Sequence, residues 1–462
     1  MPSSLAPHAS QPCRWGLSAV KKGGHPAPEM EARPTGSEFA RGYLDKLAEQ
    51  LKKTSKIHLG CRVVAISRGE VCAILPSAFL PLRTPSNPAS SMLHWSARSQ
   101  VLKTEEVHAA GEVGRDVATF NVVCCRRRAV SGEDDHDFML HNFAAVIDCS
   151  GTYGNGNHLG VGGVPALGER RLRALADTPT RAWFDSLPDV CGRDKPSFMP
   201  SPGASGRRVV LIGGGYSAAS TLLSLVELAR AEEEITLHVE WLLRRAPGCE
   251  PYARLENDPL PARHSLVAAA NALAAGEAGS LLPPNLTLHV RRGVVIDQCS
   301  SEPALECAGA LRVTGRSCAP PPPVGSKRAI GEPCCRADGR TEFELIADVV
   351  ISHVGFRPDT ALTRELHVHT CYASEGPMKL AASLLSARVA AKKGGNAAAA
   401  GDCLAQAAPG PELMRTPEPQ FFVCGAKSYG RNSAFLLTLG HAQVEAVVGI
   451  LEKELAPQPG LA

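Results

Sequence analysis

The most informative segment of the sequence is RRVVLIGGGYSAAS, residues 207–220. After two arginines it contains a short run of β-branched and aliphatic residues, 209–212, which is typical of a buried strand. Three glycines follow, and a helical pattern then extends to residue 231. A second apolar run over residues 235–243 predicts the next strand. This order of strand, turn, helix and strand indicates a βαβ unit with a parallel sheet.

The glycine turn fits a dinucleotide-binding motif of the form G-x-G-x-x-A, placed between a strand and a helix as the motif requires. The first glycine allows the tight turn, and the second leaves room for a pyrophosphate. The small third residue lets helix and strand pack closely, while the helix N-terminus faces the phosphates. An ordinary loop is the alternative interpretation. The candidate contact residues are Gly213, Gly214, Gly215, Tyr216, Ser217 and Ala218.

The residues after the second strand bear on which dinucleotide is bound. A carboxylate there would hydrogen-bond the ribose 2′-OH of NAD, whereas an arginine would accept the 2′-phosphate of NADP. The predicted strand ends in Arg244 and Arg245, and the acidic residues 232–234 precede it. NADP is therefore favoured, with a solvated arginine pair as the alternative.

Composition places the chain among ordinary globular proteins. It has 462 residues, a formal net charge of +3 and 44% hydrophobic residues, which predicts two or three domains. No dense basic run is present, so nucleic acid is not an expected partner. Residues 209–229 form a long, nearly uncharged run, but their glycines and serines favour a strand, turn and helix over an integral membrane segment.

The 16 cysteines include no C-x-x-C pair, which argues against a zinc ribbon or a dithiol redox centre. Mostly reduced thiols in a reducing compartment are expected, and we predict a cytoplasmic location. The N-terminus carries Arg14, Lys21 and Lys22 among serines, a weak organelle-transit pattern without an apolar core. No metal constellation can be argued from spacing.

The pattern of apolar residues predicts the organisation of the rest of the chain. Residues 1–33 are expected to be a poorly ordered leader. Insertions are predicted at 73–100 and 315–340. Further helices are predicted over 36–53, 262–276, 380–400 and 433–455. Further strands are predicted over 57–66, 117–123, 144–147, 286–296, 345–351 and 421–424.

Three further segments carry a resemblance to a known family. VIDCSG at 146–151 and VISHVG at 350–355 look like strand-then-glycine crossovers, and FVCGA at 422–426 looks like a late strand-plus-glycine turn. With YGRNS at 429–433, they resemble flavoproteins of the pyridine-nucleotide oxidoreductase superfamily, closest to flavin-containing monooxygenase-like enzymes. The resemblance implies that FAD and NADP are cofactors. It also implies flavin-side positions for Gly151, Gly355, Gly425, Asn432 and Ser433, before a final helix directed at the flavin.

The resemblance implies an α/β, Rossmann-like FAD/NAD(P)-binding fold, in which an NADP domain at 206–350 is inserted into an FAD domain at 34–150 and 356–455. The N-terminal FAD-binding βα unit of such proteins is not found, because Gly23 and Gly24 follow no strand. We expect an incomplete FAD domain. The monooxygenase pattern F-x-G-x-x-x-H is also absent, and without C-x-x-C a thioredoxin-reductase mechanism is excluded.

The expected function is an FAD- and NADPH-dependent oxidoreductase that passes electrons to oxygen or an organic acceptor, with a small-molecule substrate. The alternative is a non-catalytic NADP-binding remnant with a degenerate or truncated flavin domain. His158, His353 and His441 lie near glycine-rich turns, but a lone histidine is more often a packing residue, and the catalytic residues stay unassigned. The oligomeric state also stays open.

Overall fold

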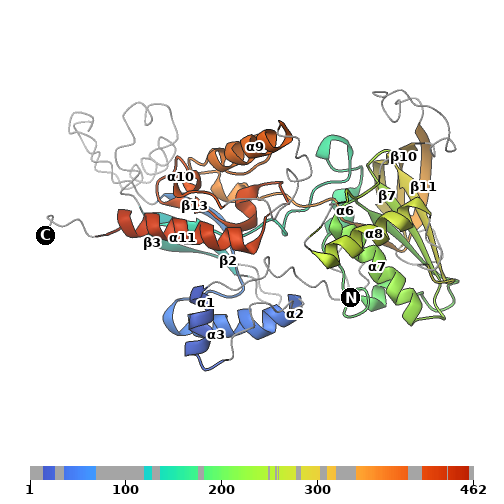
Figure 1. The fold of residues 1–462 in the computed structure, drawn as a ribbon, viewed down its shortest axis with the longest axis horizontal. Coiled ribbons are helices and arrows are strands. Elements are labelled where there is room, and N and C mark those ends of the chain that lie inside the picture. Colours follow the sequence, from blue (N-terminus) through green and yellow to red (C-terminus); the bar gives the residue numbers. More distant parts are fainter. Residues whose placement is uncertain are drawn as a thin grey trace, which may run out of the picture. The chain divides into compact units, whose positions relative to one another are not determined.

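The computed structural model divides the chain into two compact units (Figure 1). Unit 1 comprises Asn155–Phe356, and unit 2 comprises Pro7–Gly154 with Arg357–Ala462. Unit 1 is therefore an insertion in the sequence of unit 2. The structure describes residues 14–25, 36–68, 119–126, 136–174, 182–247, 250–254, 258, 260–276, 282–301, 310–318, 340–393, 408–433 and 435–456.

Unit 1 is built on a five-stranded parallel sheet in the order β5-β12-β6-β7-β8. In the register of the sheet, Val209 lies between Val349 and Val239. The predicted α/β fold with a parallel sheet is confirmed. The strands are β5 (Trp183–Phe184), β6 (Arg207–Ile212), β7 (Leu237–Leu243), β8 (Leu286–Arg292) and β12 (Val349–Ser352).

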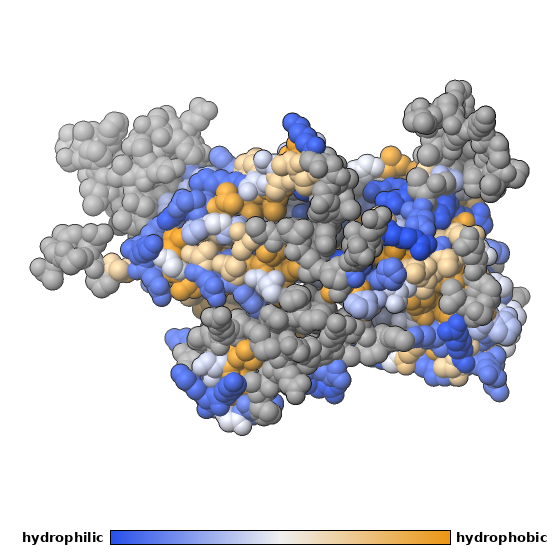
Figure 2. Space-filling view, in the orientation of Figure 1, coloured by the Kyte–Doolittle hydropathy of each residue, from blue (hydrophilic) through white to orange (hydrophobic). Residues whose placement is uncertain are grey.

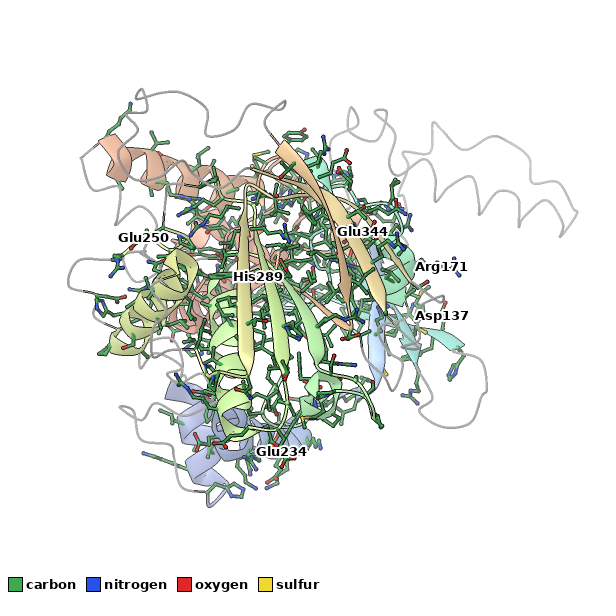
Figure 3. All side chains as sticks on the ribbon, turned by 90° about the vertical axis from the view of Figure 1, so that its right-hand side faces the viewer. Asp137, Arg171, Glu234, Glu250, His289 and Glu344 are labelled. Atoms are coloured by element: carbon green, nitrogen blue, oxygen red, sulfur yellow. The ribbon has the colours of Figure 1, made fainter. Side chains whose placement is uncertain are left out.

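The central strand β6 is buried on both faces of the sheet. Val209 and Leu211 pack against α7 (Tyr216–Ala231) and α8 (Pro261–Ala275), whereas Val210 and Ile212 face a second core. That core is closed by an antiparallel sheet of β9 (Val295–Ser301), β10 (Leu311–Cys318) and β11 (Arg340–Ala347). Figure 3 shows the helices and this antiparallel sheet on opposite sides of the parallel sheet. Burial on both faces explains why β6 is a continuous apolar run.

Several predicted boundaries in unit 1 are wrong. The strand predicted over 286–296 is two strands, β8 and β9, because the chain bends at Gly293 with φ +62°. The strand predicted over 345–351 is likewise β11 and β12, separated by Asp348, whose carboxylate pairs with Arg208. The insertion predicted at 315–340 begins inside β10, and its residues 319–339 lie outside the described part of the chain. Helix α6 (Glu169–Ala174) and strand β5 have no counterpart in the prediction.

Unit 2 contains a parallel pair of strands with packing on both faces. In this pair β4 (Val146–Asp148) lies beside β13 (Phe421–Val423). Phe421 and Val423 pack with Ile66 and Phe120, whereas Phe422 packs with residues of α10 and α11. The remaining strands form an antiparallel sheet of β1 (Cys61–Arg68), β2 (Phe120–Arg126) and β3 (His136–Phe143). The helices are α1 (Arg14–Lys22), α2 (Gly36–Phe39), α3 (Asp45–Thr54), α9 (Met378–Lys393), α10 (Pro411–Met414) and α11 (Leu437–Glu454).

Unit 2 also corrects the sequence prediction. Residues 14–22 of the predicted leader form α1, in which Val20 is fully buried. The helix predicted over 36–53 is interrupted by a π-helical segment, Ala40–Leu44. Strand β3 was not predicted, and the predicted strands 57–66, 117–123 and 144–147 have ends that are shifted by one to four residues. The predicted helix 380–400 is described as helix only to Lys393. The insertion predicted at 73–100 lies outside the described residues.

Among the described residues, no helix combines the length and apolar character needed to cross a bilayer. The run 209–229 is divided between β6, the glycine turn and α7, as predicted. The surface mixes residue types. Figure 2 shows hydrophobic residues among hydrophilic ones where α11 lies, and Leu437, Val444 and Val448 of this helix are exposed.

Candidate dinucleotide-binding site

The glycine turn lies at the point in the parallel sheet where the order of the strands reverses. From β6 the chain passes through α7 to β7 on one side, whereas β12 lies on the other side of β6. In open parallel sheets this topological switch point leaves a crevice at the carboxyl ends of the strands, and ligands bind there. The predicted motif therefore lies at the crevice where ligands bind in this type of sheet.

Gly213 is the residue of the turn that must be glycine. Its φ of +135° is disfavoured for other residues, and a Cβ there would overlap the carbonyl oxygen of His353, directly after β12. The Gly213 N–H donates to the Leu242 carbonyl of β7 at 3.0 Å. The first glycine thus lets the turn fit between two neighbouring strands.

Two aromatic side chains hold the carbonyl groups of the turn. Trp241 Nε1 donates to the Gly213 carbonyl oxygen at 2.9 Å, and the Tyr252 hydroxyl donates to the Gly215 carbonyl oxygen at 3.0 Å. The Tyr252 ring stacks between those of Trp241 and Tyr216, with centroid distances of 6.3 and 6.1 Å. Burial raises the pKa of the Tyr252 hydroxyl, which therefore stays a donor. Neither residue is predicted from the sequence to lie at the turn, although Trp241 is part of the predicted strand.

The outer side of the turn is open. Gly215 is the N-cap of α7, and a Cβ there would have no atom within 4 Å. Residues 214–217 are exposed, whereas Ala218 is fully buried against the sheet. The first N–H groups of a helix have no carbonyl one turn earlier, and the first turn of α7 has no acidic residue. Backbone donors and the helix dipole together favour an anion at this position.

Arg244 and Arg245 directly follow the carboxyl end of β7 and are exposed. The Arg245 guanidinium donates to the Glu250 carbonyl oxygen at 2.8 Å. Within the described residues, the Arg244 guanidinium makes no hydrogen bond or ion pair. Glu234 lies at the amino end of β7, far along the sheet from Glu250 (Figure 3). The carboxyl end of β7 is therefore followed by two arginines, whereas the acidic residues 232–234 lie before its amino end.

Buried His353 ties β12 to α7. Its Nε2 lies 2.9 Å from the Thr221 hydroxyl, and burial lowers its pKa to about 4. His353 is thus neutral near pH 7 and supports the turn through packing. His158 lies 3.4 Å from the Glu169 carboxylate, and His441 is a partly buried residue of α11. Among the described residues, the contacts of these three histidines do not indicate a catalytic role.

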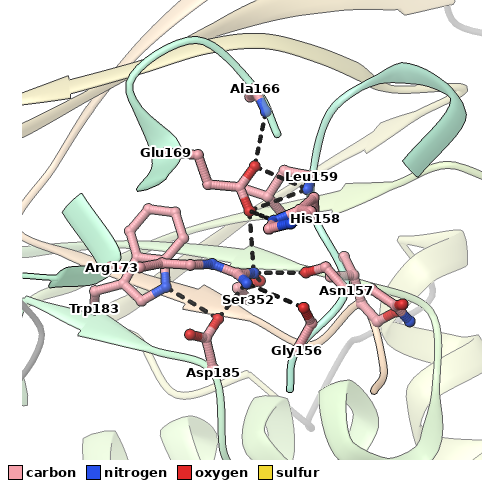
Figure 4. Close-up of polar contacts among 11 residues, drawn as sticks. Gly156, Asn157, His158, Leu159, Ala166, Glu169, Arg173, Trp183, Asp185 and Ser352 are labelled. Atoms are coloured by element: carbon pink, nitrogen blue, oxygen red, sulfur yellow. Dashed lines mark hydrogen bonds and ion pairs between the residues drawn. The ribbon is translucent and has the colours of Figure 1, made fainter. Parts of the chain in front are cut away.

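A buried charge network holds the segment through which the chain enters unit 1 (Figure 4). The Glu169 carboxylate is fully buried, accepts hydrogen bonds from the Leu159 and Ala166 N–H groups, and pairs with Arg173 at 3.1 Å. Arg173 also donates to the carbonyl oxygens of Gly156 and Asn157. Arg173 also pairs with Asp185 at 3.1 Å, and because the buried Glu169 carboxylate has both a cation and hydrogen-bond donors, this network has a structural role. Sequence analysis did not find it.

The entry and exit segments of unit 1 lie side by side. Gly156 forms an antiparallel bridge with Phe356, and the Asn157 N–H donates to the Gly355 carbonyl oxygen at 2.9 Å. Gly355 has a φ of +85°, and a Cβ there would be 3.3 Å from the Asn157 side-chain amide. Its glycine identity thus has a structural reason.

The other candidate residues lie in unit 2. Gly425 follows β13 with a φ of +73°, and its N–H donates to Gln443 Oε1 at 2.8 Å. Gly151 follows β4 with a φ of +72°. Buried Lys427, two residues after Gly425, pairs with buried Asp148, three residues before Gly151, at 2.6 Å. Sequence analysis did not single out this ion pair.

The predicted position of Asn432 and Ser433 at the start of the final helix is wrong. Helix α11 begins at Leu437, after an extended N-cap at Leu436. The Asn432 N–H donates to the Tyr429 carbonyl oxygen, so this segment closes the turn after the 3-10 segment Gly425–Tyr429. The two side chains therefore do not cap α11.

The structure thus brings Gly213–Ala218, Arg244 and Arg245 together at one edge of the parallel sheet of unit 1. Within the described residues of unit 2, no strand–glycine–helix turn with the same spacing occurs. The described residues also contain no cluster of three or more His, Cys, Asp or Glu side chains that could hold a metal ion.

No family model matches the chain, and no curated protein matches it. Among solved structures, the chain is similar to the bacillithiol disulfide reductase Bdr from Bacillus cereus, with 13% identity, coverage of 92% of this chain and 79% of that chain, and a TM-score of 0.44. It is also similar to a thioredoxin reductase from T. acidophilum, with 15% identity, coverage of 92% of this chain and 82% of that chain, and a TM-score of 0.42. A third similar structure is an FAD-dependent pyridine nucleotide-disulphide oxidoreductase from Desulfovibrio vulgaris, with 15% identity, coverage of 74% of this chain and 60% of that chain, and a TM-score of 0.36. Likenesses of this degree assign no activity to this chain.

Proposed function

We propose that the protein is an oxidoreductase that binds NADPH at the turn Gly213–Ala218. The observation that carries the proposal is the open glycine turn between β6 and α7, at the switch point of a parallel sheet. Its carbonyl groups are held by Trp241 and Tyr252, so the turn is rigid before a ligand arrives. A rigid turn reduces the ordering penalty of binding.

The residues present fit a dinucleotide phosphate. The first N–H groups of α7 would hold the pyrophosphate, and the missing Cβ of Gly215 leaves space for it. Arg244, at the end of β7, would hold the 2′-phosphate. Tyr216 is 49% exposed and stacks on Tyr252, so it would cover one side of the ligand. When bound, NADPH supplies a hydride.

For the second cofactor we propose FAD, bound by unit 2, with electrons passing on to oxygen or to an organic acceptor and with a small molecule as substrate. The support is the resemblance of the strand-then-glycine segments around Gly151 and Gly425, both of which lie in unit 2. The described residues of unit 2 contain no glycine turn for a diphosphate, so the proposal assigns no individual contact to the flavin. The monooxygenase-like subtype and the cytoplasmic location stay predictions.

The absence of such a turn among the described residues of unit 2 favours a second candidate function. In that case the chain binds NADP at unit 1 but carries no flavin and transfers no hydride. Both candidates share the nucleotide site and differ in the second cofactor.

Purified protein titrated with NADPH, and separately reconstituted with FAD, tests the proposal. We expect saturable NADPH binding, loss of that binding in Gly215→Val, flavin absorbance and NADPH consumption. Gly449→Ala is the control, because Gly449 lies in α11 of unit 2, outside the turn, and a Cβ there would have no atom within 4 Å. NADPH binding to a colourless protein that never takes up FAD would select the second candidate. Absence of NADPH binding to folded protein would reject both.

A further inference from the structure

Two cysteines occupy adjacent positions at the carboxyl ends of the parallel strands of unit 2. Cys149 follows β4 and Cys424 follows β13, and the preceding residues Asp148 and Val423 are register partners. The Cys424 N–H donates to the Asp148 carbonyl oxygen at 3.0 Å, so the strands are still paired at this point. Neighbouring strands lie about 4.8 Å apart, within the roughly 4.4–6.8 Å between Cα atoms that a disulfide requires.

The side chains of the two cysteines meet. Both are free thiols, and their sulfur atoms are hydrogen-bonded to each other. Cys149 is exposed, whereas Cys424 is only 1% exposed. A disulfide could therefore form with little movement of the backbone, and only Cys149 of the two residues is exposed.

The hydrogen bond distinguishes the two thiols electrostatically. It lowers the pKa of Cys149, against the opposing effects of burial and of the Asp148 charge. The same hydrogen bond, with burial, raises the pKa of Cys424. Lys427 pairs with Asp148 at 2.6 Å, which limits the repulsion that this carboxylate exerts on a thiolate. Cys149 thus has the properties of an attacking thiolate and Cys424 those of a protected thiol.

We propose that Cys149 and Cys424 form a redox-active pair that reduces small-molecule disulfides. The Cys149 thiolate attacks one sulfur of R–S–S–R, which breaks that bond and releases one thiol after the leaving sulfur takes a proton from solvent. The Cys424 sulfur then attacks Cys149 in the mixed disulfide and gives its proton to the second departing thiol. Two protein thiols become one disulfide while one small-molecule disulfide becomes two thiols. This exchange requires neither NADPH nor flavin.

None of the other described cysteines follows a strand beside a second cysteine that follows its register partner. Cys371 also has a lowered pKa, but the cause is hydrogen bonding with Ser374 and not a second thiol. Cys124 pairs in register with Val63, two residues from Cys61, and burial raises its pKa. Cys299 is fully buried, and its pKa is raised to about 12. Cys191 is exposed, but burial of its sulfur raises its pKa. It therefore provides a control.

The test uses the full-length protein, reduced, freed of reductant and treated with glutathione disulfide. The wild type is expected to lose two hydrogen atoms in intact mass and to yield a peptide linking Cys149 to Cys424. Cys424→Ser is expected to stop at a stable glutathione adduct on Cys149, and Cys149→Ser to form neither product at this pair. Cys191→Ser should behave as the wild type.

If a Cys424 variant does not fold, the peptide map of the wild type still shows whether Cys149 and Cys424 become linked. A wild type that carries a stable glutathione adduct on Cys149, or none, without any Cys149–Cys424 link would overturn the proposal. A link formed equally in the presence and absence of NADPH would support it independently of the proposed function.

Discussion

Trp241 Nε1 donates a 2.9 Å hydrogen bond to the carbonyl oxygen of Gly213. The bond joins the middle of β7 to the first residue of the turn after β6, and the Trp241 ring is fully buried. The tryptophan therefore fixes the orientation of the peptide group on which the candidate nucleotide site is built.

Trp241→Phe removes this donor and leaves the Gly213 carbonyl group without its side-chain partner. We expect a loss of about 1–3 kcal/mol in the free energy of unfolding, because a buried acceptor loses its hydrogen bond and ring volume is lost. Urea denaturation measures the change. An unchanged denaturation midpoint would mean that the hydrogen bond does not contribute to stability.

Gly213→Ala and Gly214→Ala form a matched pair. At Gly213 an alanine would overlap the His353 carbonyl oxygen at a φ of +135°, whereas at Gly214 it would only touch the flexible Leu243 side chain. We expect the first substitution to destabilise the protein by about 1–3 kcal/mol or more and the second to have a small effect. Thermal unfolding of both variants checks this, and equal melting temperatures would contradict it.

Arg244→Ala should change coenzyme preference. Loss of a guanidinium that contacts the 2′-phosphate is expected to weaken NADPH binding about tenfold or more, while NADH binding changes little. Arg254→Ala is the control, because Arg254 is already engaged by the Glu250 carboxylate. Parallel titrations with both coenzymes provide the measurement. Equal weakening for NADPH and NADH would show that Arg244 does not recognise the phosphate.

Acidification should destabilise unit 1 through His353. The folded protein holds this pKa at about 4, below the ordinary value of 6.5, so between these pH values the unfolded chain binds more protons. Stability from this group is therefore fully present above about pH 6.5 and falls by roughly 3 kcal/mol as the pH falls to about 4. His353→Gln, which keeps a polar side chain beside Thr221 but does not titrate, should flatten this dependence. Denaturation at several pH values gives both slopes, and parallel slopes would contradict the assignment.

Lys427→Met should be strongly destabilising. It leaves the Asp148 carboxylate buried without its cation, which typically costs about 3–5 kcal/mol. The double variant Asp148→Asn with Lys427→Met should recover part of the loss, because no charge is then stranded. Chemical denaturation of the single and double variants measures the coupling. Additive effects would show that the two groups do not interact.

The sequence predicts best where the local pattern and the packing agree. Strand β6 and helix α7 begin or end within one residue of the prediction, because β6 is apolar on both faces and the glycines mark the turn. Gly293 and Asp348 each divide a segment that was predicted as one strand. A single strand-breaking residue within a longer strand-like segment is not recognised from the pattern of apolar residues. Helix α1 was missed because its stabilisation includes burial of Val20 in the tertiary structure.

The parts of the site that depend on distant residues could not be predicted. The Tyr252 hydroxyl reaches Gly215, and Lys427 reaches Asp148, only after the chain has folded. The proximity of Cys149 and Cys424 is likewise not visible in the cysteine spacing. The absence of C-x-x-C excludes a local dithiol, whereas Cys149 and Cys424 meet through the pairing of β4 with β13.

Amide hydrogen exchange with and without NADPH locates the bound nucleotide on the chain. We expect NADPH to slow exchange at the exposed N–H groups of residues 214–217 and in the segment containing Arg244 and Arg245, and Gly215→Val to abolish both effects. Protection confined to other segments, or unchanged exchange at saturating NADPH, would show that the nucleotide does not bind at this turn.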